Sequence, residues 1–153
     1  MTDPKPDPDT ARALDLFVKL LRAERAVTAQ TEPSILATGL TVTQFGVLEA
    51  LWHKGPLCHG ELKRKVLTSP ANLTDVIDKL EKRGLVARGR AETDARRVRV
   101  QLTEAGRALI TTAFPAHAQA IRQAMAALCP AEQATLAALL RKLGLAIDAA
   151  ATS

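Results

Sequence analysis

Residues 69–103 read SPANLTDVIDKLEKRGLVARGRAETDARRVRVQLT, and this stretch decides the fold of the chain. Its first part predicts a helix, because apolar residues recur at helical spacing until Gly84 provides a C-terminal stop. These residues are Leu73, Val76, Ile77 and Leu80. Its last part predicts two short strands, over 85–88 and 97–102, and the second alternates strictly between apolar and polar residues. The polar, charged segment 89–96 between them predicts the tip of a β-hairpin.

Two more short helices are predicted upstream. Thr41 and Gln44 form a capping box, which opens a helix that Gly55 and Pro56 close. Another helix is expected over 59–66. The order helix, helix, helix, strand, charged tip, strand is that of a winged helix-turn-helix. In that motif a short helix supports a second one, whose N-terminal residues enter the major groove of DNA.

Longer helices are predicted on both sides of this motif. The first runs from Thr10 to about 29 and ends at or before Pro33, after a disordered tail over 1–9. The second begins after Thr103, and Pro115 is expected to kink it. The last begins at Pro130 and carries an apolar stripe expected to face inward. Its members are Leu136, Leu139, Leu140, Leu143 and Ile147.

The predicted fold is therefore mainly α with a small β-hairpin wing, a winged helix-turn-helix joined to a helical dimerisation lobe. We expect a dimerisation helix and loop over 10–38, the DNA-binding lobe over 39–103 and further dimerisation helices over 104–153. The apolar stripes of the flanking helices must be buried against some other surface.

Composition and charge narrow the function. The chain has 153 residues and a net charge of +5, and residues 61–99 carry the whole excess with eleven Lys or Arg against six Asp or Glu. Such a localised basic segment is typical of a protein that binds a polyanion. From charge alone, the alternative is a solvated charged face that binds nothing. No apolar run is long enough to span a membrane and the N-terminus does not resemble a signal peptide, so a cytoplasmic protein is expected.

Several ordered motifs resemble the MarR family of transcriptional regulators. They are LTVTQFGVL at 40–48, GPLCHGEL at 55–62, the segment 69–86, and the wing pattern with Asp94, Arg96 and VQLTEAG at 100–106. The likeness is strong over about 40–109 and loose in the flanking helices. The resemblance implies a homodimeric repressor that binds double-stranded DNA at a pseudo-palindromic operator, with two recognition helices about 34 Å apart.

The predicted recognition helix supplies most of the expected DNA contacts. Ser69, Asn72 and Thr74 are expected to meet base edges or phosphates, and Pro70 to occupy the first helical position. The charged residues that follow have two interpretations each. Asp75 accepts a hydrogen bond from a cytosine amine or is merely solvated. The cations face the DNA backbone or the solvent. These cations are Lys79, Lys82 and Arg83.

The wing is expected to contact the minor groove. By resemblance, Arg96 is the residue that enters the groove and Asp94 orients it through a charge-assisted hydrogen bond. Many relatives carry a second Arg directly after that Asp, where this chain has Ala95. Arg90 and Arg97 are the cations available to compensate.

Two kinds of effector are expected to release the DNA. One is an oxidant: Cys58 and Cys129 each occupy the cap position before a helix, where the positive end of the helix dipole favours a thiolate. The alternative for both is a free thiol without a role. The other effector is a small phenolic or aromatic ligand between the two lobes. Candidate lining residues are Phe17, Leu21, Trp52 and His53, for which ordinary apolar packing is the alternative.

Other functions fit the residues less well. A winged-helix module that binds protein rather than DNA is the alternative reading, although the basic wing argues against it. The three histidines do not cluster with carboxylates, so no metal or other cofactor is expected. An enzyme is not expected either, because the chain has no nucleophile motif, Gly-rich phosphate loop or catalytic carboxylate pair.

Overall fold

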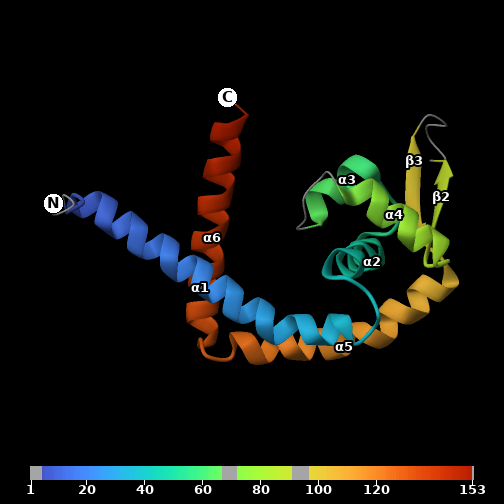
Figure 1. The fold of residues 1–153 in the computed structure, drawn as a ribbon, viewed down its shortest axis with the longest axis horizontal. Helices are drawn as coiled ribbons and strands as arrows, with labels where there is room; N and C mark the ends of the chain where they lie inside the picture. Colours follow the sequence, from blue (N-terminus) through green and yellow to red (C-terminus); the bar gives the residue numbers. More distant parts are fainter. Residues whose placement is uncertain (1–4, 67–71, 91–96, 153) are drawn as a thin grey trace.

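A computed structural model describes residues 5–66, 72–90 and 97–152. A long helix α1 (Pro8–Leu36) lies along helix α5 (Glu104–Met125), and together they form a base (Figure 1). Helix α6 (Pro130–Ala151) rises from one end of this base and the winged lobe stands on the other end. None of the described helices is long and apolar enough to cross a membrane.

The winged lobe contains α2 (Val42–Lys54), β1 (Leu57–Cys58), α3 (His59–Lys65), α4 (Leu73–Lys82), β2 (Val86–Arg90) and β3 (Val98–Leu102). Each helix contributes apolar side chains to one core. Phe45 and Leu48 of α2, Leu62 of α3 and Leu80 of α4 are at most 1% exposed, and Ile110 of α5 joins them. Leucine-rich packing on the first half of α5 thus fixes the lobe to the base.

The wing is a three-stranded antiparallel sheet in the order β1-β3-β2. The predicted hairpin is confirmed, with Val86 opposite Leu102 and Arg90 opposite Val98. Sequence analysis missed β1, in which Leu57 pairs with Val100. Two residues are too few for an alternating pattern to be recognised. The added strand holds the start of α3 against the wing, and it leaves β2 as an edge strand.

Helix α1 is longer at both ends than predicted. It begins at Pro8 because the Asp7 carboxylate accepts the backbone N–H groups of Asp9 and Thr10, and Pro is favourable in the first turn. The prediction that Pro33 ends it was wrong, since the helix continues to Leu36. Its last turns pack on α2 and α5 and bury Ile35, so tertiary contacts outweigh the backbone hydrogen bond that a proline removes.

Helix α5 begins as predicted after Thr103, whose hydroxyl accepts the N–H of Gly106. Pro115 lies inside α5, and the helix changes direction along its length (Figure 1). The expectation that the α6 stripe faces inward is wrong for the single chain, because α6 has no buried residue and Leu139 is 58% exposed. The spacing identified an apolar face correctly but does not reveal which surface covers it.

Candidate nucleic-acid interface

Helix α4 has one apolar and one polar face. Leu73, Val76, Ile77 and Leu80 are buried in the lobe, which matches the predicted stripe. The opposite face is exposed and carries Thr74, Asp75 and Lys79, and Asn72 lies at the N-cap. Packing on one side therefore leaves the polar residues of this short helix exposed, in an arrangement that suits a helix entering the major groove of DNA.

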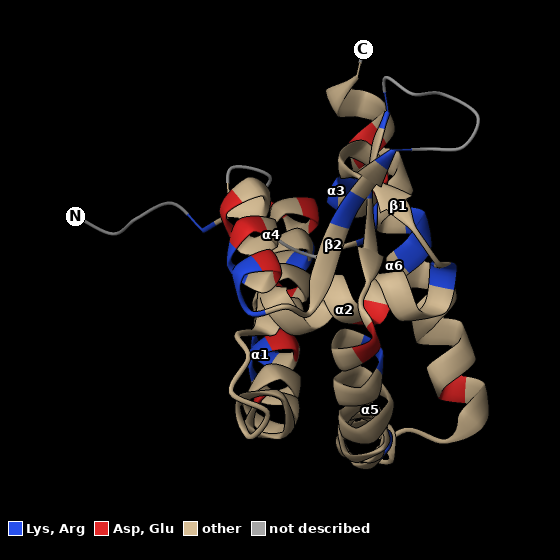
Figure 2. Cartoon of the chain, turned by 90° about the vertical axis from the view of Figure 1, so that its right-hand side faces the viewer, with Lys and Arg blue, Asp and Glu red and all other residues tan. Residues whose placement is uncertain are grey.

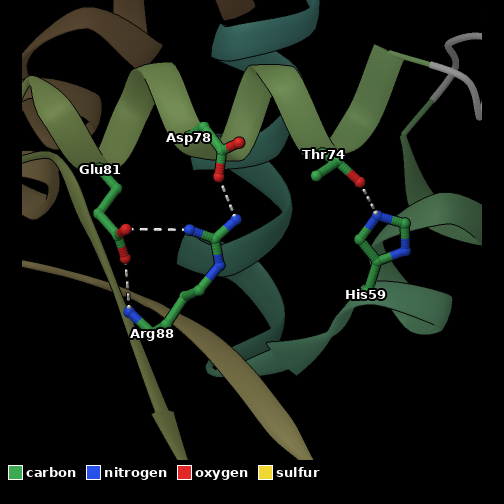
Figure 3. A network of polar contacts seen from close by, with 5 residues as sticks. All are labelled: His59, Thr74, Asp78, Glu81 and Arg88. Carbon is green, nitrogen blue, oxygen red and sulfur yellow. Dashed lines mark hydrogen bonds and ion pairs between the residues drawn. The ribbon is translucent and has the colours of Figure 1, made fainter.

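Polar contacts near both ends of α4 tie its exposed side to its neighbours (Figure 3). Near the N-terminal end of α4, Nε2 of His59 lies 3.2 Å from the hydroxyl of Thr74 and so connects α3 to α4. Near the other end, the guanidinium of Arg88 on β2 contacts Asp78 at 2.5 Å and Glu81 at 2.9 Å. The hydrogen bond to Asp78 raises the pKa of Arg88, so this group remains a cation.

Basic residues follow the wing. Arg88 and Arg90 lie on β2, and Arg97 and Arg99 lie on or beside β3. Figure 2 shows these cations along the hairpin, whereas α4 carries acidic and basic residues side by side. Arg90 and Arg97 are exposed. The hairpin thus presents positive charge next to a helix whose own charges largely offset one another, which suits the phosphates that flank a groove.

Some of the residues predicted to contact DNA lie in the described part of the chain and others do not. Ser69, Pro70, Asp94 and Arg96 lie outside the described residues. Lys79 forms an ion pair with Asp75 at 2.7 Å along the helix, so the charges of the two groups partly offset each other. Arg83 points elsewhere. Its guanidinium donates to the carbonyl of Gly39 at 3.1 Å and links the end of α4 to the loop before α2.

Sequence reasoning did not assign a role to His59, Asp78, Glu81 or Arg88. Asp78 and Glu81 are visible as acidic residues three apart on one side of the predicted helix. Their partner is ten and seven residues further along the chain, on a strand. Nothing in the spacing reveals such a contact, because it depends on how the sheet lies against the helix.

A cavity of about 450 Å³ lies where α1, α2 and α5 meet. Its wall includes Ile35, Phe45, His53 and the buried His117, and Lys65 is at its edge. Nδ1 of His117 lies 3.0 Å from the hydroxyl of Ser34, and the ring meets Phe45 edge-on with centroids 5.0 Å apart. The volume is in the usual range for a small-molecule site. Its wall combines apolar residues with polar and charged ones, including Glu32, Glu49 and Lys54.

Of the four residues predicted to line an effector pocket, one lies in the wall of this cavity and three do not. His53 lines this cavity. Trp52 packs against Phe114 with ring centroids 5.0 Å apart, and Phe17 and Leu21 lie on the exposed part of α1, so these three are not in its wall within a single chain. His117 was missed, although it continues the apolar stripe of α5 at seven residues from Ile110.

Both cysteines are free thiols. Cys58 is half-buried and precedes α3, where its backbone N–H donates to the Glu61 carboxylate at 2.8 Å. Cys129 is exposed and its N–H donates to Glu132 in the same way before α6. The predicted N-terminal placement of both cysteines is confirmed. Hydrogen bonding from Cys58 lowers the pKa of Glu61, so this carboxylate carries charge at the start of α3.

Known proteins match this architecture. The family model described as the MarR family matches residues 40–98. The HTH-type transcriptional regulator MhqR of Bacillus subtilis is 35% identical over 136 residues, which cover 89% of this chain and 94% of that protein. The structure of BpsR from Bordetella bronchiseptica, whose DNA binding is regulated by 6-hydroxynicotinic acid, has a TM-score of 0.75 at 32% identity and covers 85% of this chain and 98% of that chain.

A DNA-bound structure has the same fold. Sco3205 of Streptomyces coelicolor, solved in complex with DNA, has a TM-score of 0.80 at 23% identity and covers 90% of this chain and 92% of that chain. The likeness to MhqR extends over both the winged lobe and the flanking helices. The chain therefore belongs to the MarR family and is a DNA-binding transcriptional regulator with a winged helix-turn-helix.

Proposed function

We propose that two copies of this chain form a homodimer that represses transcription from a pseudo-palindromic operator. In this proposal residues 10–38 and 104–153 form the dimerisation lobe and 39–103 the DNA-binding lobe. The observation that carries it is the apolar surface on α1 and α6, which no other part of the described chain covers. Its large members are Leu14, Leu16, Phe17, Val18, Leu21, Leu136, Leu139, Leu140, Leu143, Leu145 and Ile147, all more than 40% exposed.

A second copy is the partner that fits this surface. Helices α1 and α6 each carry several large apolar side chains that are exposed, and large exposed apolar surfaces are rare on monomers and mark association sites. A two-fold arrangement pairs the same helices of both chains, which closes the assembly, and it places two α4 helices on one side of the dimer. Two recognition helices about 34 Å apart fit successive major grooves of one duplex.

Sedimentation velocity tests the dimer. Leu139→Glu places a charge on the exposed face of α6 and is expected to shift the protein from dimer to monomer, because a buried unpaired charge is strongly unfavourable. Val98→Glu is a matched control, since Val98 is 51% exposed on β3 in the wing, away from both helices. A wild-type monomer, or a Leu139→Glu protein that sediments as the wild type does, would contradict the proposal.

The proposed effector is a small aromatic molecule with a phenolic or acidic group, bound in the cavity between α1, α2 and α5. The apolar part of the wall, with Ile35 and Phe45, accepts the ring. The imidazole of His117 suits a hydroxyl, and the cations of Lys54 and Lys65, which offset Glu32 and Glu49 of the same wall, suit a carboxylate. The regulation of BpsR by 6-hydroxynicotinic acid supports this chemical class. Occupation of a cavity that touches α1 and α2 would change how the winged lobe sits on the dimer, and so the spacing of the α4 helices.

The only tryptophan provides a direct readout. Trp52 is in contact with His53, which lines the cavity, so a bound ring is expected to change its fluorescence. 6-Hydroxynicotinic acid and a simple phenol are suitable first probes. His117→Phe keeps an aromatic ring against Phe45 but removes the polar nitrogens, so it is expected to weaken binding. His59→Phe changes a histidine of the winged lobe instead and is expected to leave binding unchanged. Equal ligand binding by both variants would show that the ligand does not bind in this cavity.

Oxidation of a cysteine is a second proposed route to release. Cys58 is the stronger candidate because it pairs with Arg99 across the sheet and begins α3, so a change there reaches both the wing and the supporting helix. Peroxide treatment is expected to release DNA from the wild type and from Cys129→Ser but not from Cys58→Ser. Release from Cys58→Ser would show that Cys58 is not the switch.

A further inference from the structure

One arginine joins the wing to the recognition helix. The guanidinium of Arg88 on β2 donates through Nη2 to Asp78 at 2.5 Å and through Nη1 to Glu81 at 2.9 Å, and the backbone N–H of Arg88 donates to the second oxygen of Glu81 at 3.3 Å (Figure 3). A side chain and a strand backbone are thus held at once by two carboxylates one turn apart on α4.

This contact lies where the described part of the hairpin leaves the buried core. Strand β2 is an edge of the sheet, bonded only to β3. Arg90, two residues after Arg88 on β2, is exposed, and Val98 opposite it is 51% exposed. The buried residues of the hairpin, Val86 and Val100, lie at its base or beside Arg88. The pair Arg90 and Val98 therefore lies outside the core, beyond the level of Arg88.

We propose that Arg88, Asp78 and Glu81 form a clamp that sets the angle between the wing and α4, so that both can engage the same duplex together. A planar guanidinium holds two carboxylates in a fixed orientation, which a flexible ammonium cannot do. Two contact elements held at a set separation bind more tightly than two that move independently, because the second contact is made within the complex. Arg88 is a positioning residue for operator binding and need not touch DNA.

A different explanation makes the opposite prediction. Asp78 and Glu81 carry negative charge on the side of α4 beside the basic hairpin, and Arg88 would then only neutralise two groups that repel phosphates. If charge alone matters, Asp78→Ala with Glu81→Ala should tighten DNA binding, since two acids leave a surface that faces a polyanion. Arg88→Lys, which keeps the charge, should then bind as the wild type does.

The test compares the wild type, Arg88→Lys and the Asp78→Ala, Glu81→Ala double variant on two duplexes. One is a fragment selected by the protein from genomic DNA, and the other is an unrelated sequence. The clamp predicts that both variants lose between about threefold and tenfold in affinity for the selected fragment, since two exposed ion pairs are involved. Affinity for the unrelated duplex should be unchanged in Arg88→Lys and unchanged or higher in the double variant.

Hydroxyl-radical footprints separate this proposal from the DNA-binding proposal on which it rests. In both variants the clamp predicts weaker protection of the flanking minor grooves, where the wing lies, while the major-groove contacts of α4 persist at saturating protein. Wild-type footprints in both variants, or tighter binding by the double variant to the selected fragment, would overturn the clamp. Absence of any protection by the wild type would instead refute the proposed mode of DNA binding.

Discussion

Gly106 is the position where a single methyl group should cost the most. It lies in the first turn of α5, against the start of the wing. A Cβ atom added there would lie 1.9 Å from the carbonyl oxygen of Leu85 and 3.3 Å from a methyl carbon of Leu102. The first distance must lengthen by at least 1.1 Å to reach the 3.0 Å below which real Cβ contacts are essentially never found. The obstacle is backbone, which cannot move aside as a side chain does.

The size of the effect follows from what such a shift breaks. The Leu85 carbonyl accepts the N–H of Thr103 at 3.1 Å, a bond worth about 1 kcal/mol. The Thr103 hydroxyl caps α5 and contacts the Gly84 carbonyl at 2.6 Å, which adds about 1 kcal/mol. Overpacking typically costs a further ~1–3 kcal/mol. Alanine is the better helix former by up to about 1 kcal/mol. Gly106→Ala is therefore expected to destabilise the fold by ~2–4 kcal/mol.

Thermal unfolding at one fixed protein concentration measures this. For a chain of this size the expected loss lowers Tm by roughly 5–15 °C. Gly60→Ala is the matched control, because a Cβ at this exposed position of α3 meets nothing within 4 Å, and its Tm should not fall. A Gly106→Ala protein that unfolds within about a degree of the wild type, on the same scale, would refute the close approach of α5 to Leu85.

Three other substitutions test separate parts of the account. The Thr41 hydroxyl caps α2 by accepting the Gln44 N–H at 3.1 Å. Thr41→Ala removes this cap and should lower the free energy of unfolding by about 1 kcal/mol. An unchanged denaturant midpoint would contradict this. Glu61 has a lowered pKa, chiefly because of the Cys58 N–H, so its stabilising effect is present above its ordinary pKa of 4.5 and is lost as the pH falls through the lowered value. The stability difference between wild type and Glu61→Ala should therefore shrink as the pH falls below 4.5 in denaturant titrations, and a constant difference would argue against this contact. Arg96→Ala should weaken operator binding by ~1–3 kcal/mol in gel-shift titrations at fixed salt, and an unchanged affinity would remove Arg96 from the proposed interface.

The sequence pattern correctly predicted those helices and strands whose formation depends on interactions between residues close together in the chain. The capping box of Thr41 and Gln44 has both of its hydrogen bonds, and the spacing of the apolar residues placed the buried face of α4 correctly. The wing hairpin followed from alternation and a charged tip. These features depend on contacts within a few residues, so a single sequence contains them.

Features that depend on distant partners were not predictable in the same way. Pro33 stands in a helix because the turns around it pack on α2 and α5, and β1 exists because β3 lies beside it. Arg88 meets α4 only because the edge strand runs alongside that helix, and His117 meets Ser34 across 83 residues. The candidate site could thus be located on α4 and the wing from the sequence, but the contacts that orient it required the fold.

The spacing of half-sites tests the central claim most directly, namely that two chains place their α4 helices and wings on successive turns of one duplex. Fragments selected from genomic DNA would be compared with versions that carry about 5 or about 10 extra base pairs at the centre, which correspond to half a turn and a full turn. The native spacing should bind two chains per duplex with an affinity that falls as salt rises, and the half-turn insertion should abolish tight binding. Binding by one chain, or an affinity indifferent to the half-turn insertion, would contradict the account.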